Sequence, residues 1–185
     1  MLNYDFPETK REFATVNDYS CAAGLAAEIL SISTDKNKAL AVYAFAGMSY
    51  MQQELAHHFC EKAKSLGHND IFITDDIEEL FSSKNTERIS GIYVSHASYL
   101  EVCRKAEKAW QGSEMPKIVV SDLYDECVPY LENGTVTAVI YQEPEQQAFL
   151  TAVSLYELIS ERKRPDDILR INPLVIMRSN YKKYL

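Results

Sequence analysis

Two polar side chains stand just past the ends of neighbouring apolar segments in the second half of the chain. Asp122 follows the apolar run at 117–121, and Gln142 follows the run at 135–141. In α/β proteins, ligands bind outside the carboxyl ends of the strands, where loops carry polar side chains into a shared crevice. A carboxylate accepts hydrogen bonds from hydroxyl groups, and an amide both donates and accepts them. The pair therefore predicts a binding site for a hydroxyl-rich ligand such as a sugar.

Both residues also have a purely structural interpretation, which the sequence leaves open. Asp122 is a candidate N-cap for a helix expected from Leu123 to Leu131, because an Asp side chain accepts hydrogen bonds from the first free N–H groups of a helix. Gln142 is a candidate for a hinge hydrogen bond to the backbone.

Other residues that follow predicted strands complete the candidate ligand set. These residues are Tyr50, Gln52, Asp75 and His96. Tyr50, Tyr99 and Tyr124 are placed to stack on a sugar ring, although a core or surface role is the default in a chain with 12 tyrosines.

Acid–base catalysis is the competing hypothesis for the same loops. Asp75, Asp76 and His96 fall on adjacent loops and are the types that transfer protons. The strands carry no GxSxG, P-loop or GxGxxG motif. We therefore expect a binding protein and not an enzyme.

Composition narrows the class of protein. The net charge of −8 argues against nucleic-acid binding by this segment, which would need clustered Lys and Arg. No apolar stretch is long enough to span a bilayer, and residues 1–12 lack a signal-peptide core. We expect a cytoplasmic protein with no membrane contact.

The sequence predicts no metal and no cofactor. Its four cysteines are widely spaced and fall in predicted helices, which favours free thiols in a reducing compartment. His57 and His58 point to different sides of a helix, and no second ligand cluster accompanies them and Cys60.

Short apolar strands alternate with amphipathic helices, which predicts an α/β protein with a three-layer, Rossmann-like parallel sheet. Strands are expected at 13–16, 39–46, 71–74, 91–95, 117–121, 135–141 and 174–177. Helices are expected after Asn17-Asp18 and at 49–66, 77–81, 98–110, 123–131 and 144–160.

The order and spacing of several segments resemble one family. They are VNDYSCAAGLAAEIL, FCEKAKSLG, GIYVSHASYLEV, IVVSDLYDECVPYLENGTVTAVIYQEPEQQAFLTA and NPLVIMRSN. Together they resemble the effector-binding domain of lactose-repressor-type transcription regulators, in a Bacteroides-like variant, which is similar in turn to periplasmic ribose-binding proteins. The resemblance implies a type I periplasmic-binding-protein-like fold, with two lobes and a sugar held in the cleft between them.

The resemblance also implies a domain plan. Residues 13–141 would form the C-terminal lobe, and residues 142–180 would be a crossover helix and strand of the N-terminal lobe. Residues 1–12 and 181–185 would be terminal segments. The DNA-binding headpiece and most of the N-terminal lobe would lie outside these 185 residues, so that DNA is reached only through a headpiece that this chain does not contain.

Site residues transfer from the family one by one. Asp122 would accept hydrogen bonds from sugar hydroxyls, and Gln142 would supply an amide contact across the hinge. His96 and Ala97 stand where relatives carry Asn and Asp, and Leu55 stands where relatives carry an arginine. The resemblance therefore implies a sugar-like effector that differs from the usual one, with Gln52, Gln53 or Tyr50 as substitutes for the arginine.

The segment 144–160 needs a partner surface. Its apolar face consists of Phe149, Ala152, Val153, Tyr156 and Ile159. We expect it to fold back, to swap with a second copy, or to be buried in a homodimer. Two alternatives to a regulator remain: a solute-binding protein of a sugar transport system, and a stand-alone dimerisation domain.

Overall fold

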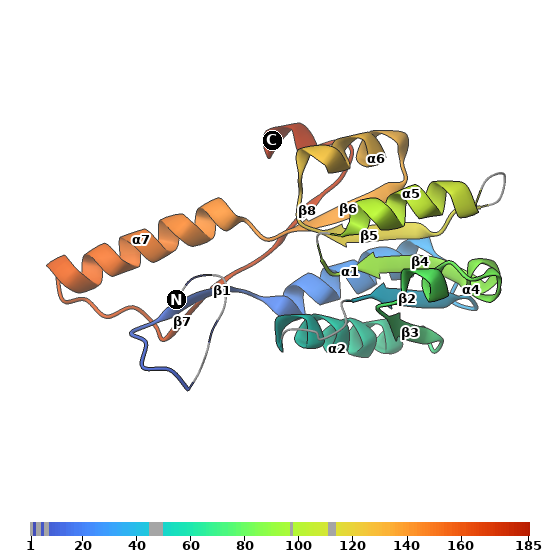
Figure 1. Ribbon diagram of the computed structural model, residues 1–185. Coiled ribbons are helices and arrows are strands. Elements are labelled where there is room, and N and C mark those ends of the chain that lie inside the picture. The colour runs from blue at the N-terminus through green and yellow to red at the C-terminus, as the bar shows by residue number, and fades with distance from the viewer. Residues whose placement is uncertain (1, 3–4, 6–7, 45–49, 97, 111–113) are drawn as a thin grey trace. The chain divides into compact units, whose positions relative to one another are not determined.

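The computed structural model describes residues 2, 5, 8–44, 50–96, 98–110 and 114–185 (Figure 1). The chain divides into two compact units. We call them the strand-pair unit, Met1–Asp18 with Gln142–Leu174, and the sheet unit, Tyr19–Tyr141 with Val175–Leu185.

The sheet unit is built on a six-stranded sheet with the strand order β3-β2-β4-β5-β6-β8. Its strands are β2 (Ala39–Tyr43), β3 (Ile71–Thr74), β4 (Ile89–Val94), β5 (Lys117–Ser121), β6 (Val136–Tyr141) and β8 (Leu174–Ile176). The pairs from β3 through β6 are all parallel. Their connections are therefore crossovers, and their carboxyl ends meet at one edge of the sheet.

Helices cover both faces of this sheet. The helices are α1 (Tyr19–Ser33), α2 (Tyr50–Ser65), α3 (Ile77–Leu80), α4 (Ser83–Arg88), α5 (Tyr99–Ala109), η1 (Asp125–Cys127), α6 (Val128–Asn133) and η2 (Tyr181–Lys183). α1 and α2 lie on one face, and α5 and α6 lie on the other (Figure 1).

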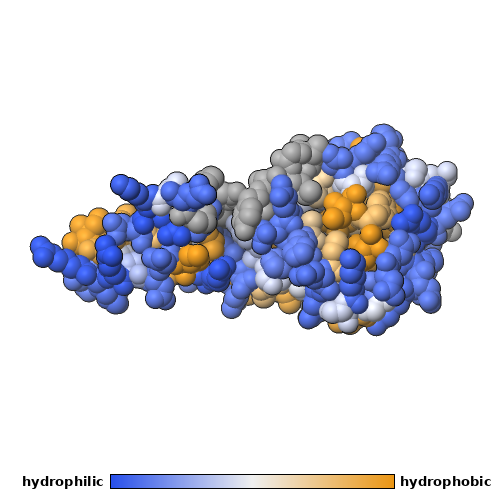
Figure 2. All heavy atoms as spheres, turned by 90° about the horizontal axis from the view of Figure 1, so that it is seen from below, coloured by the Kyte–Doolittle hydropathy of each residue, from blue (hydrophilic) through white to orange (hydrophobic). Residues whose placement is uncertain are grey.

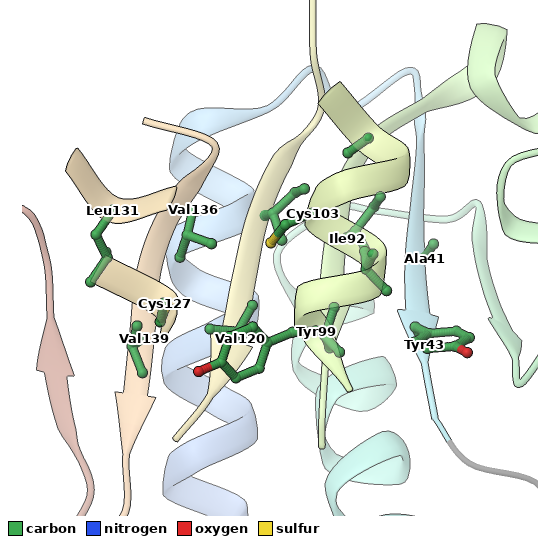
Figure 3. Packing of buried hydrophobic residues seen from close by; sticks show 14 of the residues in the cluster. Ala41, Tyr43, Ile92, Tyr99, Cys103, Val120, Cys127, Leu131, Val136 and Val139 are labelled. Atoms are coloured by element: carbon green, nitrogen blue, oxygen red, sulfur yellow. The ribbon is translucent and has the colours of Figure 1, made fainter. Parts of the chain in front are cut away.

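Two separate cores explain why the central strands are apolar at nearly every position. In β2, Leu40 and Val42 pack with α1 and α2, whereas Ala41 and Tyr43 belong to the core under α5 and α6. Figure 3 shows the second core, in which Tyr99 and Cys103 of α5 lie among side chains of the strands. The result is the three-layer α/β arrangement that the sequence predicts.

The strand-pair unit contains the parallel strands β1 (Ala14–Asn17) and β7 (Ile168–Ile171) and the helix α7 (Pro144–Ser160). β1 is wholly buried. α7 buries only Gln147 and Ser154 and leaves its large apolar side chains exposed. Phe149 and Tyr156 are each 65% exposed, and Ile159 is 71% exposed. Figure 2 shows apolar atoms on the surface where α7 lies in Figure 1, and the exposed face agrees with the expected need for a partner.

Most expected elements are confirmed with nearly the same bounds, and those at 71–74, 117–121 and 144–160 match residue for residue. Gly67 ends α2 and Gly134 ends α6 with φ angles of 96° and 87°, as left-handed C-terminal glycines do. Ser49, the expected first residue of the helix at 49–66, lies outside the described residues. Among the described residues, no helix is both long and apolar enough to cross a bilayer.

The two compact units divide the chain at other residues than the lobes that the resemblance implies. The first strand does not join the large sheet but pairs with β7, a strand that was not predicted. The last strand, β8, lies beside β6 in the large sheet and not in the other unit. The 181–185 end belongs to the sheet unit, where the Tyr181 hydroxyl donates to Glu132 Oε1 at 2.5 Å. In each case, the place of the segment is set by a partner that lies far from it in the sequence.

Two glycines make a matched test of this packing. A Cβ on Gly91 in β4 would lie 2.8 Å from Leu40 Cδ2 and 3.1 Å from Leu30 Cδ2, whereas a Cβ on Gly24 in α1 meets nothing within 4 Å. We expect Gly91→Ala to lower the free energy of unfolding by about 1 kcal/mol through overpacking. Gly24→Ala should raise it by about 0.5–1 kcal/mol through helix propensity. Urea denaturation of both variants measures the difference, and equal effects would contradict the close approach of α1 to β4.

Candidate functional site

The strand register places the sequence-predicted site residues along one edge. Tyr43 is paired with Thr74 on one side and with Val94 on the other, and Val94 is paired with Val120. His96 and Asp122 each follow their aligned residue by two positions, on neighbouring strands. Since adjacent strands are about 4.8 Å apart, the two backbones are close enough for one sugar ring to reach both.

Asp122 is held in an unusual backbone conformation directly after β5. Its φ angle is 68°, in the left-handed region, and its N–H donates to the carbonyl oxygen of Ile140 at 3.0 Å. The helix that it was expected to cap begins later, with η1 at Asp125 and Tyr124 in the cap position. The helix-cap interpretation of Asp122 is therefore wrong, and its partly exposed carboxylate lies at the sheet edge.

His96 is almost buried beside Tyr43, with their ring centroids 5.1 Å apart. Its Nδ1 accepts a hydrogen bond from the Ser98 N–H at 3.1 Å. Burial lowers the pKa of the His96 imidazole below its usual value, so the ring is neutral at pH 7. Ala97, the other substituted family position, lies outside the described residues.

Asp75 is exposed after β3, and β3 is three strand positions from β5 in the sheet order. That separation corresponds to about 14 Å. Asp75 therefore lies at the same edge as Asp122 but too far from it for one sugar ring to contact both. Asp76 has a structural role, because its Oδ1 accepts from the Glu78 N–H at 2.8 Å and caps α3.

α2 brings the remaining candidates to this edge. Tyr50 is its first residue, with a side chain outside the described part, and Gln52 lies partly exposed in the first turn. Leu55 is only 2% exposed in the core. Phe59 stacks on Tyr93 with a centroid distance of 5.2 Å. Position 55 is thus occupied by a packing residue.

The tyrosines near Asp122 divide into one core residue and one exposed residue. Tyr99 is fully buried, and burial and then the neighbouring Cys127 raise the pKa of its hydroxyl. Tyr124 stacks on Tyr99 at 6.1 Å and remains 44% exposed. Of these two, Tyr124 is therefore the one available to a ligand.

Gln142 belongs to the strand-pair unit and is engaged there. Its Oε1 accepts from Asn17 Nδ2 at 2.7 Å, and its carbonyl oxygen accepts from Gln147 Nε2 at 2.7 Å. The side-chain bond is to another side chain and not to the backbone, so the expected hinge interaction has a different partner.

The sequence did not single out two groups at this edge. Tyr43 ends β2 and contacts His96, and the Tyr93 hydroxyl lies 3.0 Å from Ser121 Oγ between β4 and β5. The signal was available for Tyr43 and Ser121, because each places a polar atom at the last position of a largely apolar strand. None of the four cysteines forms a disulfide, and no group of three or more His, Cys, Asp or Glu side chains in the described ranges is arranged to hold a metal.

No family model and no curated protein sequence matches the chain, but solved structures do. The glucose-galactose binding protein GanP of Geobacillus stearothermophilus superposes with a TM-score of 0.80 at 20% identity, over 96% of this chain and 66% of that one. A protein described as a LacI transcriptional regulator from Bacteroides fragilis gives 0.81 at 14%, over 99% and 68%. A periplasmic ribose ABC transporter structure from Conexibacter woesei gives 0.85 at 15%, over 99% and 65%.

These likenesses establish the fold. The chain has a type I periplasmic-binding-protein-like α/β fold, with a mostly parallel sheet flanked by helices. It spans about two thirds of the length of the three proteins.

The backbone of Asp122 can be tested apart from its carboxylate. The left-handed conformation costs about 1–2 kcal/mol for a residue with a Cβ, and least for Gly, Asn and Asp. We expect Asp122→Gly and Asp122→Asn to be more stable than Asp122→Ala by about 1 kcal/mol. Chemical denaturation of the three variants measures this order. If Asp122→Ala were as stable as Asp122→Gly, the positive φ angle would not be a constraint.

Proposed function

We propose that the chain is the sugar-binding part of a lactose-repressor-type transcription regulator. A sugar-like effector is bound at the carboxyl edge of the sheet unit by Asp122, with His96 and Tyr124 beside it. The single observation that carries the proposal is the position of Asp122, a partly exposed residue directly after β5, one strand from the ring of His96.

Two lines support the sugar. Asp122 accepts hydroxyl protons and Tyr124 offers a ring face, which together suit the polar rim and apolar face of a pyranose or furanose. Several structural neighbours are named for sugars, including glucose-galactose, ribose and D-arabinose binding proteins. No catalytic role is proposed for the described residues of this edge.

The segments quoted above favour the regulator, and the likeness to transport-system binding proteins favours a solute-binding protein as the second candidate. A regulator acts in the cytoplasm and reaches DNA through a helix-turn-helix headpiece, whereas a solute-binding protein is exported by a signal peptide. The coding sequence upstream of Met1 distinguishes the two.

Sugar binding is tested by NMR titration of the 185-residue chain with neutral hexoses and pentoses at millimolar concentration. We expect weak, saturable shifts at His96, Asp122 and Tyr124, and loss of at least tenfold in affinity in Asp122→Asn, because a hydrogen bond to a charged group is lost. Asp35→Asn, at the opposite edge of the sheet, is the matched control. Shifts confined to other residues, or none with any sugar, would refute the proposal.

The proposal includes a homodimer formed through α7. Phe149 and Tyr156 are seven residues apart, as are Ala152 and Ile159, and all four are exposed. This is the spacing of a helix–helix seam. The helix begins beside Glu143 and Glu145 and is followed by Arg162, Lys163 and Arg164. Antiparallel pairing of two copies would bring each acidic beginning next to a basic end, with opposed helix dipoles.

Sedimentation velocity over a concentration series tests the dimer. We expect the wild-type chain to dimerise and the double variant Phe149→Glu/Tyr156→Glu to remain monomeric with an unchanged far-UV spectrum. Ile32→Glu is the control, since Ile32 is 87% exposed on α1. A wild-type monomer at every concentration would overturn the dimer and assign the face to a different polypeptide.

A further inference from the structure

The loops at the carboxyl edge of the sheet unit carry Asp and Glu but no Lys or Arg. The segments after β2, β3, β4 and β5 read AFAGMSYMQQ (44–53), TDD (74–76), SHAS (95–98) and SDLYDE (121–126). None contains Lys or Arg. Five carboxylates belong to them: Asp75, Asp76, Asp122, Asp125 and Glu126.

The negative charge reaches the aromatic groups at this edge. Burial and then the carboxylates of Glu101 and Asp75 raise the pKa of the Tyr43 hydroxyl. Burial and then Asp122 raise the pKa of Tyr124. Both rings thus lie in a negative potential, and the neutral imidazole of His96 contributes no positive charge against it.

The positive charges that could offset these carboxylates are either partial charges or already paired with a carboxylate. Lys105 lies near enough to lower the pKa of Tyr43 slightly, but its ammonium group is bound to Glu78. α3 begins at the Asp76 cap, and α5 carries Glu101 in its first turn. α2 has no acid in its first turn, and its partial charge of about +0.5 is smaller than the charge of one carboxylate.

An anionic ligand needs a partner that this edge does not supply. Sugar phosphates and sugar acids are held in proteins by Arg and Lys or by uncapped helix N-termini. Sugar hydroxyls donate well to carboxylates, and an ammonium group would gain from them. From this distribution of charge we infer that the site discriminates by ligand charge, accepting neutral or amino sugars and rejecting sugar phosphates and sugar acids. This inference rests on the proposed function and names the ligand class of that same site.

Two matched sets of ligands test the inference by NMR titration of the 185-residue chain. The first set is D-glucose, D-glucosamine, D-glucuronate and D-glucose 6-phosphate, and the second is D-ribose with D-ribose 5-phosphate. We expect each anion to bind about tenfold or more weakly than its neutral counterpart at low salt, because of Coulomb repulsion. The ratio of the affinity for the neutral sugar to the affinity for its anionic counterpart should decrease at high salt. D-glucosamine should bind at least as tightly as D-glucose.

Two variants connect the ratio to the named charges. Asp75→Asn/Glu101→Gln should narrow the neutral-to-anionic ratio several-fold, whereas Asp35→Asn at the opposite edge should leave it unchanged. An anion that binds more tightly than its neutral counterpart would overturn this inference while leaving the sugar site in place. No binding by any member of either set would overturn the proposed function, and the inference with it.

Discussion

The burial of the parallel sheet on both faces is the constraint on which the rest of the structure depends. Because α1 and α2 cover one face and α5 and α6 cover the other, the central strands are apolar at nearly every position. A charged side chain within them would have no water and no partner. Polar chemistry is therefore confined to strand ends, which is why Asp122, His96 and Asp75 all lie just past a strand. The site and the core are two consequences of one packing arrangement.

Local patterns in the sequence predicted most of the sheet unit, because its longer helices and its central strands each carry their own signal. A continuous apolar run marks a strand buried on both faces, and the stripe at Tyr99, Val102, Cys103 and Ala106 marks the buried side of α5. The positions of β1, β7 and β8 in the sheets could not be predicted in this way. β1 and β7 are set by pairing between residues more than 150 positions apart, as in Ala14 with Ile168. β8 is set by its place beside β6, and nothing local encodes either partner.

The site was predictable by position but not by geometry. The sequence placed Asp122, His96 and Asp75 at one edge, and the register supports that. It did not predict that Asp122 adopts a left-handed conformation and leaves the helix start to η1, since Asp is common both at helix caps and in left-handed turns. Nor did it predict the bond from Asn17 to Gln142, which depends on the unforeseen place of β1.

The same requirement for burial applies to the strand-pair unit, but this unit does not meet it by itself. Two parallel strands are too few for independent stability, and parallel strands require cover on both faces. β1 is buried, yet α7 turns Phe149, Tyr156 and Ile159 toward solvent. The structural neighbours match nearly all of this chain but continue for about a third of their own length beyond it. Phe149, Tyr156 and Ile159 thus form an apolar face that the described residues of this unit leave uncovered. The same exposed face is available to a second copy, because its seven-residue spacing and its oppositely charged ends allow it to pair with itself.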